Sequence, residues 1–322
     1  MSADKFNGVS LSSITRIDGV RKEEIDNLNG VTVPSYFLAT HTGAQAAYSL
    51  RKLSSTATTA ITVENSSGTT ADIGFDSNGD LDTSALTTHC GSNYGRVSKW
   101  WDQSGNNRHM EQSTAASRPY IVDGSGNVIT TTTNSIPTLD FYFDSTGRDL
   151  TDTFVSNNSD RLMISLVAEF RSVTLGQYIF NQWTSDQSTQ VFQMNILGTH
   201  RDLRLAARFG TTSKHLGRVQ TNAQVAVDTE YIVVGSLDHV SGDLDVNGDT
   251  ADTDTGFPGS SGAGLINNGN LVASIGRRSN NGDDPAAAQY TGFLSEVILW
   301  SDTTLPTQSD VMTDTNTHYS IF

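Results

Sequence analysis

Oxygen-bearing side chains at alternating positions are the residues whose spacing could bind a metal ion. They occur at Asp76, Asn78, Asp80 and Asp82. Hard cations such as Ca²⁺ are held by oxygens at this spacing, but the later glutamate that completes an EF-hand loop is missing. A similar partial pattern is formed by Asp243, Asp245, Asn247 and Asp249. Because Asp and Asn are also common turn formers, we favour turns at both places and keep calcium as the alternative.

Other common signatures of chemistry are absent from the sequence. The seven histidines show neither HxH nor HExxH spacing, which argues against a zinc site. The Gly-x-Ser-x-Gly elbow of esterases and the phosphate-binding loop of nucleotide enzymes are both missing. Cys90 is the only cysteine, so the chain has no intrachain disulfide and no cysteine-based zinc site. We therefore expect no cofactor other than the calcium considered above.

One short segment has concentrated turn chemistry. It consists of Trp101, Asp102, Gln103, Ser104, Gly105 and Asn106. Short polar side chains of this kind bond to nearby backbone amides, and a glycine permits a positive φ. We favour a structural corner here over a ligand contact.

Charge and hydropathy limit the partners. The chain has 35 acidic and 20 basic residues and a net charge of -15. Binding to a phosphate backbone depends on Lys and Arg displacing counterions, so we expect no nucleic-acid partner. No apolar run reaches about 18 residues, and the first ten residues carry neither a basic leader nor an apolar stretch. We expect no membrane span and no signal peptide.

The first 35 residues contain a repeat with a period of 11 residues. Each copy has an apolar residue, Asn or Asp, Gly and Val, and an Ile follows in the first two copies. Asn-Gly and Asp-Gly pairs favour tight turns, and so short a unit cannot bury its own apolar residues. We interpret residues 1–35 as a docking arm, with a disordered leader as the alternative, and residues 36–322 as one domain. The repeated positions are Phe6, Gly8, Val9, Ile14, Ile17, Gly19, Val20, Ile25, Leu28, Gly30 and Val31.

The remaining sequence favours an all-β fold. Strand-like segments separated by turn-rich spacers such as 123–127 and 247–256 are typical of a sandwich. The segment 43–53 has helix-compatible spacing. Thr307 could cap a last helix, with one face formed by Val311, Met312, Thr315 and Tyr319. The predicted strands are 139–143, 162–170, 177–183, 191–197, 203–209, 231–237, 271–275 and 293–300.

Four blocks of the sequence, at 47–53, 71–75, 100–107 and 290–300, are distinctive when taken together. They resemble the concanavalin A-like, or laminin-G-like, domains of bacteriophage structural proteins. The resemblance covers roughly residues 44–322, and the Asp102–Asn106 block (DQSGN) is its most specific part. It implies a jelly-roll sandwich of two antiparallel sheets with a few short helices, preceded by the repeat arm. A fold analogy alone does not carry function.

Related blocks occur in the catalytic domain of family-54 α-L-arabinofuranosidases. That resemblance places a catalytic acid in an acidic loop before the closing strand, which here matches Asp283 and Asp284. The family's nucleophile is a glutamate downstream of a vicinal cysteine pair, and the comparable stretch 180–186 has neither. Glu169 and Glu296 lie in predicted strands and are not obvious substitutes. We therefore expect no enzymatic activity.

The leading hypothesis is a phage virion structural protein, such as a capsid decoration, head-fibre or tail-associated subunit. The arm would bind other virion proteins, the sandwich would bind host surface glycans, and the chain would form a homo-oligomer. Its location would be the virion, after synthesis in the host cytoplasm. The alternatives are an arabinofuranosidase-type glycoside hydrolase and a stand-alone carbohydrate-binding adhesin.

Overall fold

The structure is a computed structural model. It describes residues 5–6, 9–10, 16–17, 20–21, 27–28, 31–32, 36–141, 148–154, 161–173, 176–184, 190–197, 202–209, 215–249, 252–255, 271–277, 289–302 and 304–322.

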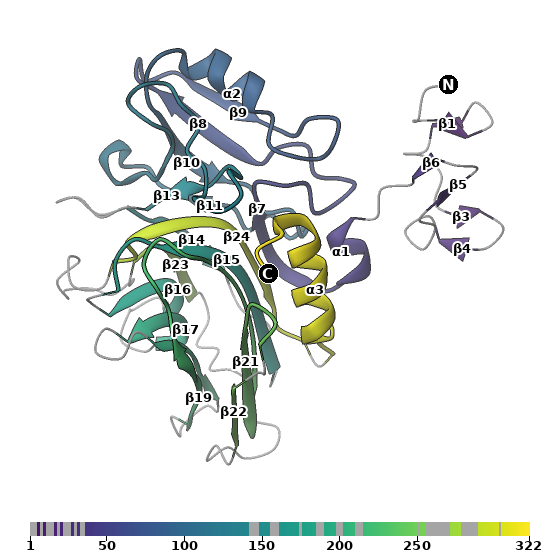
Figure 1. Ribbon diagram of the computed structural model, residues 1–322, viewed down its shortest axis with the longest axis vertical. Coiled ribbons are helices and arrows are strands. Elements are labelled where there is room, and N and C mark those ends of the chain that lie inside the picture. Colours follow the sequence, from purple (N-terminus) through teal and green to yellow (C-terminus); the bar gives the residue numbers. More distant parts are fainter. Residues whose placement is uncertain are drawn as a thin grey trace.

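Two antiparallel sheets form a sandwich (Figure 1). The first sheet contains, in spatial order, β7 (Ala44–Ser49), β24 (Gly292–Trp300), β15 (Arg161–Phe170), β20 (Glu230–Asp238), β21 (Ser241–Val246) and β22 (Asp252–Thr255). The second contains β9 (Thr70–Ile73), β8 (Ile61–Asn65), β10 (Gly95–Trp100), β11 (Met110–Glu111), β14 (Leu150–Phe154), β23 (Leu271–Ile275), β16 (Gln177–Thr184), β17 (Gln190–Leu197), β18 (Asp202–Phe209) and β19 (His215–Gln224). Two short strands, β12 (Tyr120–Val122) and β13 (Leu139–Asp140), connect β10 to β24. The prediction of an all-β jelly-roll sandwich is confirmed.

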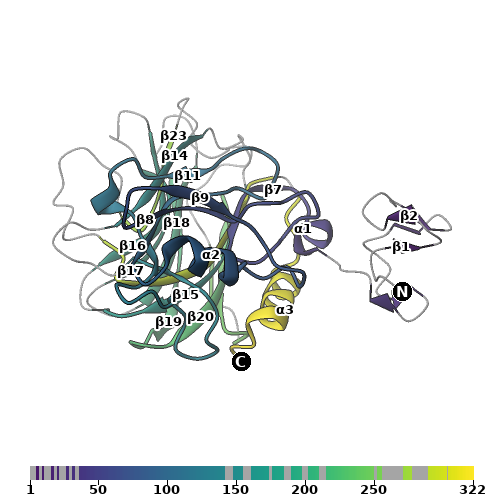
Figure 2. The same cartoon turned by 90° about the horizontal axis from the view of Figure 1, so that it is seen from above.

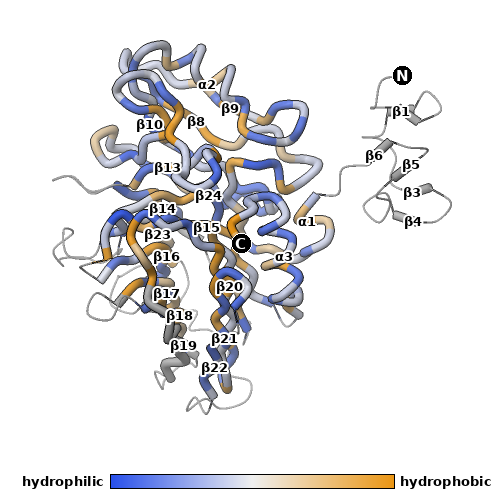
Figure 3. The backbone as a smooth tube through the Cα atoms, in the orientation of Figure 1, coloured by the Kyte–Doolittle hydropathy of each residue, from blue (hydrophilic) through white to orange (hydrophobic). Residues whose placement is uncertain are grey.

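The core lies between the sheets, and a second apolar layer covers the outer face of the first sheet. In β15, Leu162, Ile164 and Leu166 belong to the core between the sheets, whereas Met163 and Val167 belong to the outer layer. A strand buried on both faces reads as a continuous apolar run, because alternation needs one solvated face. Figure 3 shows the hydrophobic residues concentrated in the strands of the sandwich.

Helices cover that outer face. α1 (Phe37–Thr40) and α3 (Gln308–Tyr319) lie on the same side of the sandwich in two perpendicular views (Figure 2). The predicted last helix is confirmed, although the Thr307 side chain makes no capping hydrogen bond. The four residues of its predicted face, Val311, Met312, Thr315 and Tyr319, are all buried. No helix in the described part of the chain is long and apolar enough to cross a membrane.

The predicted strands between 162 and 300 match β15, β16, β17, β18, β20, β23 and β24 within two residues at each end. The spacer 123–127 is the expected turn, where the Asp123 carboxylate accepts from the amides of Ser125 and Asn127. Two details differ: the 139–143 segment is a strand only at 139–140, with 142–143 outside the described residues, and the spacer 247–256 contains β22. The sequence prediction also missed α2 (Thr83–Cys90) and the 3-10 turn Ala115–Ser117. Within residues 36–322, the strands that it missed, besides β7 and β22, are β8, β9, β10, β11, β12, β14, β19 and β21.

The expectation of a helix over 43–53 is wrong. The segment contains β7, whose six residues are all buried. Ala46 and Tyr48 face the core between the sheets, whereas Ala44 and Ala47 face the helices. Alanines on both faces remove the alternation that marks a half-buried strand, so the spacing was misleading.

The outer edge of β7 is closed by the 102–106 turn. The Asp102 carboxylate accepts from the Ala47 amide at 2.9 Å, and the Gln103 amide donates to the Ala47 carbonyl at 2.8 Å. The Gln103 side chain also donates to the carbonyls of Ser49 and Arg51, each at 3.0 Å. These bonds occupy backbone groups that an edge strand otherwise leaves unpaired. The turn therefore closes this edge of the first sheet.

Each 11-residue repeat of the arm contains a two-stranded hairpin. The strand pairs recur at the same period: β1 (Lys5–Phe6) with β2 (Val9–Ser10), β3 (Arg16–Ile17) with β4 (Val20–Arg21), and β5 (Asn27–Leu28) with β6 (Val31–Thr32). Gly8, Ile14, Gly19, Ile25 and Gly30 lie outside the described residues. The division of the chain at residue 35 and the docking role of the arm stay predictions.

Candidate functional site

A row of polar residues crosses five strands of the second sheet. Strand register places Asp72 opposite Thr62, Thr62 opposite Lys99, Lys99 opposite Glu111, and Glu111 opposite Thr151. Directly opposite residues in antiparallel strands lie on the same face of a sheet. The row lies on the face that points away from the first sheet, because the adjacent residues of these strands fill the core.

This row forms the floor of a cleft of about 770 Å³, which we call the Trp101 cleft. The volume is within the range of ligand-binding pockets, about 300–1,000 Å³. The lining residues are Thr62, Asp72, Ser98, Lys99, Trp101, Asn107, His109, Glu111, Gln112, Ser113, Arg118, Thr151, Asp152 and Val272.

The floor of the cleft is held by a chain of hydrogen bonds. The Trp101 indole Nε1 donates to Thr62 Oγ1 at 2.9 Å, and this hydroxyl donates to Asp72 Oδ1 at 2.6 Å. Lys99 Nζ lies 2.7 Å from the Glu111 carboxylate. Each side chain is thereby fixed by a neighbouring strand, so donors and acceptors are presented in a set order.

An aromatic pair borders this row. The rings of Trp101 and His109 are 4.5 Å apart between centroids, and Lys99 Nζ lies 4.7 Å from the centre of the indole ring. His109 Nδ1 accepts from the Asp102 amide at 3.1 Å, so the neutral imidazole carries its proton on Nε2. Burial, with a contribution from Lys99, lowers the pKa of His109 and favours this neutral form.

Gln112, Ser113 and Arg118 form another part of the lining, which we call the 112–118 wall. The Arg118 guanidinium donates to the backbone carbonyls of Gln112 at 2.7 Å and Ser113 at 3.0 Å. It also forms an ion pair with Glu64 at 2.8 Å. Both basic residues of the cleft, Lys99 and Arg118, are therefore engaged by glutamates.

The first oxygen-rich string, 76–82, for which calcium was the alternative to a turn, forms a turn followed by a helix cap. Asp76 Oδ1 accepts from the amides of Asn78 at 2.8 Å and Asp80 at 3.0 Å. Asp82 Oδ1 caps α2 by accepting from the Ala85 amide at 2.9 Å. Within the described ranges, no group of three or more His, Cys, Asp or Glu residues could hold a metal ion.

The second oxygen-rich string is also occupied by local bonds. Asp243 Oδ1 accepts from the Thr253 hydroxyl at 2.7 Å across β21 and β22. Asn247 Oδ1 accepts from the Ile232 amide at 2.8 Å, and its φ of 55° is typical of a tight turn. The geometry at these positions is that of strand pairing and a hairpin turn.

Most of the other site residues predicted from the sequence do not line the Trp101 cleft or lie outside the described residues. From the 101–106 segment, only Trp101 lines the cleft. Asp283 and Asp284 lie outside the described residues, as does Asp186 in the stretch compared with the arabinofuranosidase nucleophile. Sequence reasoning missed Lys99, His109 and the rest of the row. The only available signal was that His109 follows closely after the turn that positions it.

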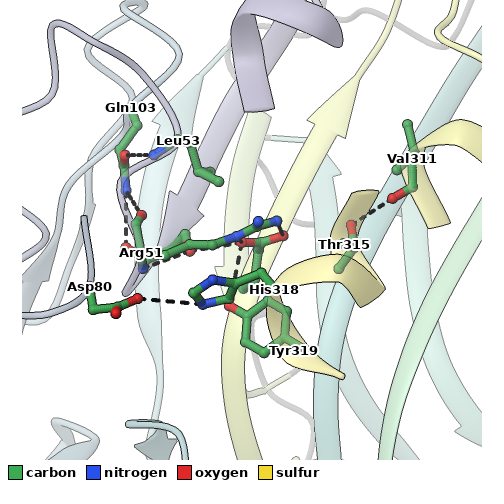
Figure 4. Close-up of polar contacts among 10 residues, drawn as sticks. Arg51, Leu53, Asp80, Gln103, Val311, Thr315, His318 and Tyr319 are labelled. Carbon is green, nitrogen blue, oxygen red and sulfur yellow. Dashed lines mark hydrogen bonds and ion pairs between the residues drawn. The ribbon is translucent and has the colours of Figure 1, made fainter. Parts of the chain in front are cut away.

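Glu296 is fully buried in β24 and is held by a dense polar network. It accepts from Arg51 Nε at 2.8 Å and Nη2 at 2.9 Å, and from the Ser49 hydroxyl at 2.8 Å. Arg51 lies beside Tyr319 of α3, where His318 Nε2 is 3.9 Å from Asp80 (Figure 4). This network attaches α3 and β7 to the first sheet. Glu296 therefore stabilises the fold rather than forming part of a cleft.

Glu169 and Glu230 form a second buried carboxyl pair. They lie directly opposite each other in β15 and β20 and are 0% and 2% exposed. Glu169 Oε2 accepts from the Thr132 amide at 3.0 Å and from its hydroxyl at 2.9 Å. Burial, together with the negative charge of the Glu169 carboxylate, raises the pKa of Glu230 to about 7. Neither carboxyl group lines the Trp101 cleft.

Comparisons with known proteins identify the fold and no family. No protein-family model and no curated protein sequence match the chain. The structure is similar to an arabinofuranosidase in complex with arabinofuranosyl-α-1,2-xylobiose, with a TM-score of 0.58 and 15% identity over 86% of this chain and 63% of that one. It is also similar to a GH54 α-L-arabinofuranosidase soaked with a cyclic sulfate inhibitor, with a TM-score of 0.55 and 15% identity over 84% of this chain.

This chain covers 63% and 62% of the two arabinofuranosidase chains. At 15% identity the likeness shows a shared β-sandwich fold alone. Nothing in these comparisons indicates a phage protein.

The Glu169–Glu230 pair predicts a specific loss of stability as the pH rises from acidic to neutral. The folded pKa of Glu230, about 7, is above its ordinary value of 4.5. Its contribution to stability is therefore complete below pH 4.5 and is lost as pH rises through 7. We expect Glu230→Gln to remove on the order of 2 kcal/mol of this loss between about pH 5.5 and 8.

Urea unfolding of native and variant protein at the two pH values measures this effect. Glu111→Gln, which breaks a partly exposed ion pair, is the matched control and should keep the native pH dependence. An unchanged pH dependence in Glu230→Gln would show that titration of Glu230 does not cause the loss of stability.

Proposed function

We propose that this chain binds carbohydrate in the Trp101 cleft. The observation that carries this proposal is the row of ordered donors and acceptors beside an aromatic pair. Sugar hydroxyls both donate and accept hydrogen bonds, so a sugar site needs donors and acceptors at fixed positions. The apolar face of a sugar ring packs on an aromatic side chain. Trp101, Thr62 and His109 offer these groups together.

Charge favours a neutral glycan. Asp72, Glu111 and Asp152 line the cleft along with only two basic residues, Lys99 and Arg118. Both basic side chains are already in ion pairs with glutamates. An anionic sugar would meet a surface with excess negative charge and no lining cation outside these pairs, so we expect it to bind less well than a neutral one.

The hydrolase alternative is supported by the fold shared with the two arabinofuranosidases, one of which is in complex with arabinofuranosyl-α-1,2-xylobiose. Its catalytic candidates are Asp283 and Asp284. A retaining mechanism needs a second carboxyl group opposite the acid. The buried positions of Glu169 and Glu296 do not favour either residue for that role.

We further propose that residues 1–35 dock the chain onto a larger assembly such as a virion. The support is the regularity of the three hairpins, which recur every 11 residues. Isolated two-stranded hairpins are marginally stable in water, so packing on a partner would stabilise them. The virion itself is supported only by the resemblance found in the sequence.

Replacing Trp101 with alanine should weaken glycan binding about ten-fold, because the variant loses the stacking surface and the donor to Thr62. A glycan array that includes neutral arabinoxylan oligosaccharides, followed by calorimetry, measures the effect. Tyr36→Ala is the matched control, since it also removes an aromatic ring beside a lysine, Lys52, but does not line the cleft. The proposal fails if the native protein binds no glycan on the array.

The hydrolase alternative predicts turnover of aryl α-L-arabinofuranosides by the native protein. Combined substitution of Asp283 and Asp284 by alanine should abolish this turnover, because the proton donor would be lost. Native protein that releases no aryl alcohol above the uncatalysed rate would rule out this alternative while leaving glycan binding open.

Deletion of residues 1–35 should leave a folded sandwich, because both sheets are built from residues 44–300. The truncated protein should no longer incorporate into particles when co-expressed with the other virion proteins. Circular dichroism checks the fold, and sedimentation of particles measures incorporation. Incorporation at the native level would overturn the docking role.

A further inference from the structure

A buried carboxylate lies directly behind the wall of the Trp101 cleft. Asp149 is 0% exposed and immediately precedes β14, whose Thr151 and Asp152 line the cleft. Its amide donates to the Ser117 carbonyl at 3.0 Å. Asp149 therefore joins the floor of the cleft to the 112–118 wall.

The side chain of Gln112 depends on this carboxylate. Gln112 Nε2 donates to Asp149 Oδ1 at 2.9 Å and to the Asp149 carbonyl at 3.3 Å. Gln112 Oε1 accepts from the Thr114 amide at 2.9 Å. The Gln112 backbone carbonyl in turn binds Arg118 at 2.7 Å. A change at Asp149 would therefore reach the wall residues that face a ligand.

The other carboxylate oxygen faces Arg277. Asp149 Oδ2 lies 3.4 Å from Arg277 Nη2 and has no hydrogen-bond donor among the described residues. Gly276, with a φ of +91°, allows this approach, because a Cβ there would lie 2.7 Å from the Arg148 carbonyl oxygen. The contact is thus a charge pair without a hydrogen bond, and it depends on the ionised form of Asp149.

We propose that Asp149 is a positioning residue of the cleft: when ionised it holds Gln112 and Arg277 in place, and when protonated it weakens ligand binding. This inference rests on the proposed glycan-binding function. It adds a control of that site by pH, exerted by a residue that does not itself contact the ligand.

The energetics favour such a control. Burial raises the pKa of Asp149 to about 6, although Arg277 and Gln112 act in the opposite direction. Above about pH 6 the fold therefore keeps an ionised Asp149 carboxylate buried, which lowers the stability of the protein. Buried groups with shifted pKa values cluster at functional sites. The other charged side chains on the segments that surround Asp149, namely β11, the 112–118 wall and the chain around β14, are Glu111, Arg118, Arg148 and Asp152.

The test is the pH profile of binding to an arabinoxylan oligosaccharide between about pH 5 and 8, measured by calorimetry. Native affinity should fall at least about five-fold below a midpoint near pH 6.

The variant Asp149→Asn should give a flat profile at the low-pH affinity. Arg277→Met should move the midpoint to higher pH, because removing the cation raises the pKa of Asp149. Asp123→Asn, which alters an exposed turn, is the control and should keep the native profile.

Hydrogen exchange at the 112–118 amides, corrected for intrinsic rates, provides a readout that needs no ligand. We expect faster exchange below pH 6 in the native protein and fast exchange at both pH values in Asp149→Asn. If the oligosaccharide does not bind but this exchange pattern is found, the choice of ligand fails and the positioning role stands. If Asp149→Asn and Arg277→Met match the native protein in both readouts, the proposal is overturned.

Discussion

The candidate site depends on one irregularity in β10. The register of β10 with β8 shifts between Val97 and Lys99, so Ser98 is an extra residue on one strand. Val97 and Trp100 are both fully buried although they are three positions apart. Strict alternation would place Lys99 in the core and Trp100 in solvent. The bulge reverses both, so that Lys99 joins the polar row while Trp100 fills the core.

Strand register also explains why the residues of the cleft come from several strands. Each member of the row belongs to a different strand and is fixed by its neighbour through register and by hydrogen bonds. Asp72 and Thr151 are distant in sequence but belong to one row because β8, β10 and β11 lie between them. A site of this kind is stiff, since its side chains are positioned by the sheet and supported from behind by the core.

Polar groups buried elsewhere have other roles. On the helix-covered face of the first sheet, Glu296 binds Arg51 and fixes β7, while Glu169 and Glu230 share a site with limited solvation. By residue type alone, these glutamates are candidates for catalysis. Their depth and partners instead link them to the packing of α3 and of the first sheet. The likeness to arabinofuranosidases is one of fold alone, and the chemistry of this chain has to be argued from its own cleft.

The sequence by itself determined the β class, the positions of seven strands between residues 162 and 300, the last helix and the turn at 102–106. These features are local, since they follow from alternation, turn residues and helical spacing over a few positions. It failed at 43–53, where burial on both faces hides the strand period. It singled out Trp101 but not Lys99, His109 or Asp149. Only the tertiary structure decided the row, the cleft and the pairing of Asp149 with Arg277, because each depends on register and on contacts between segments that no local pattern records.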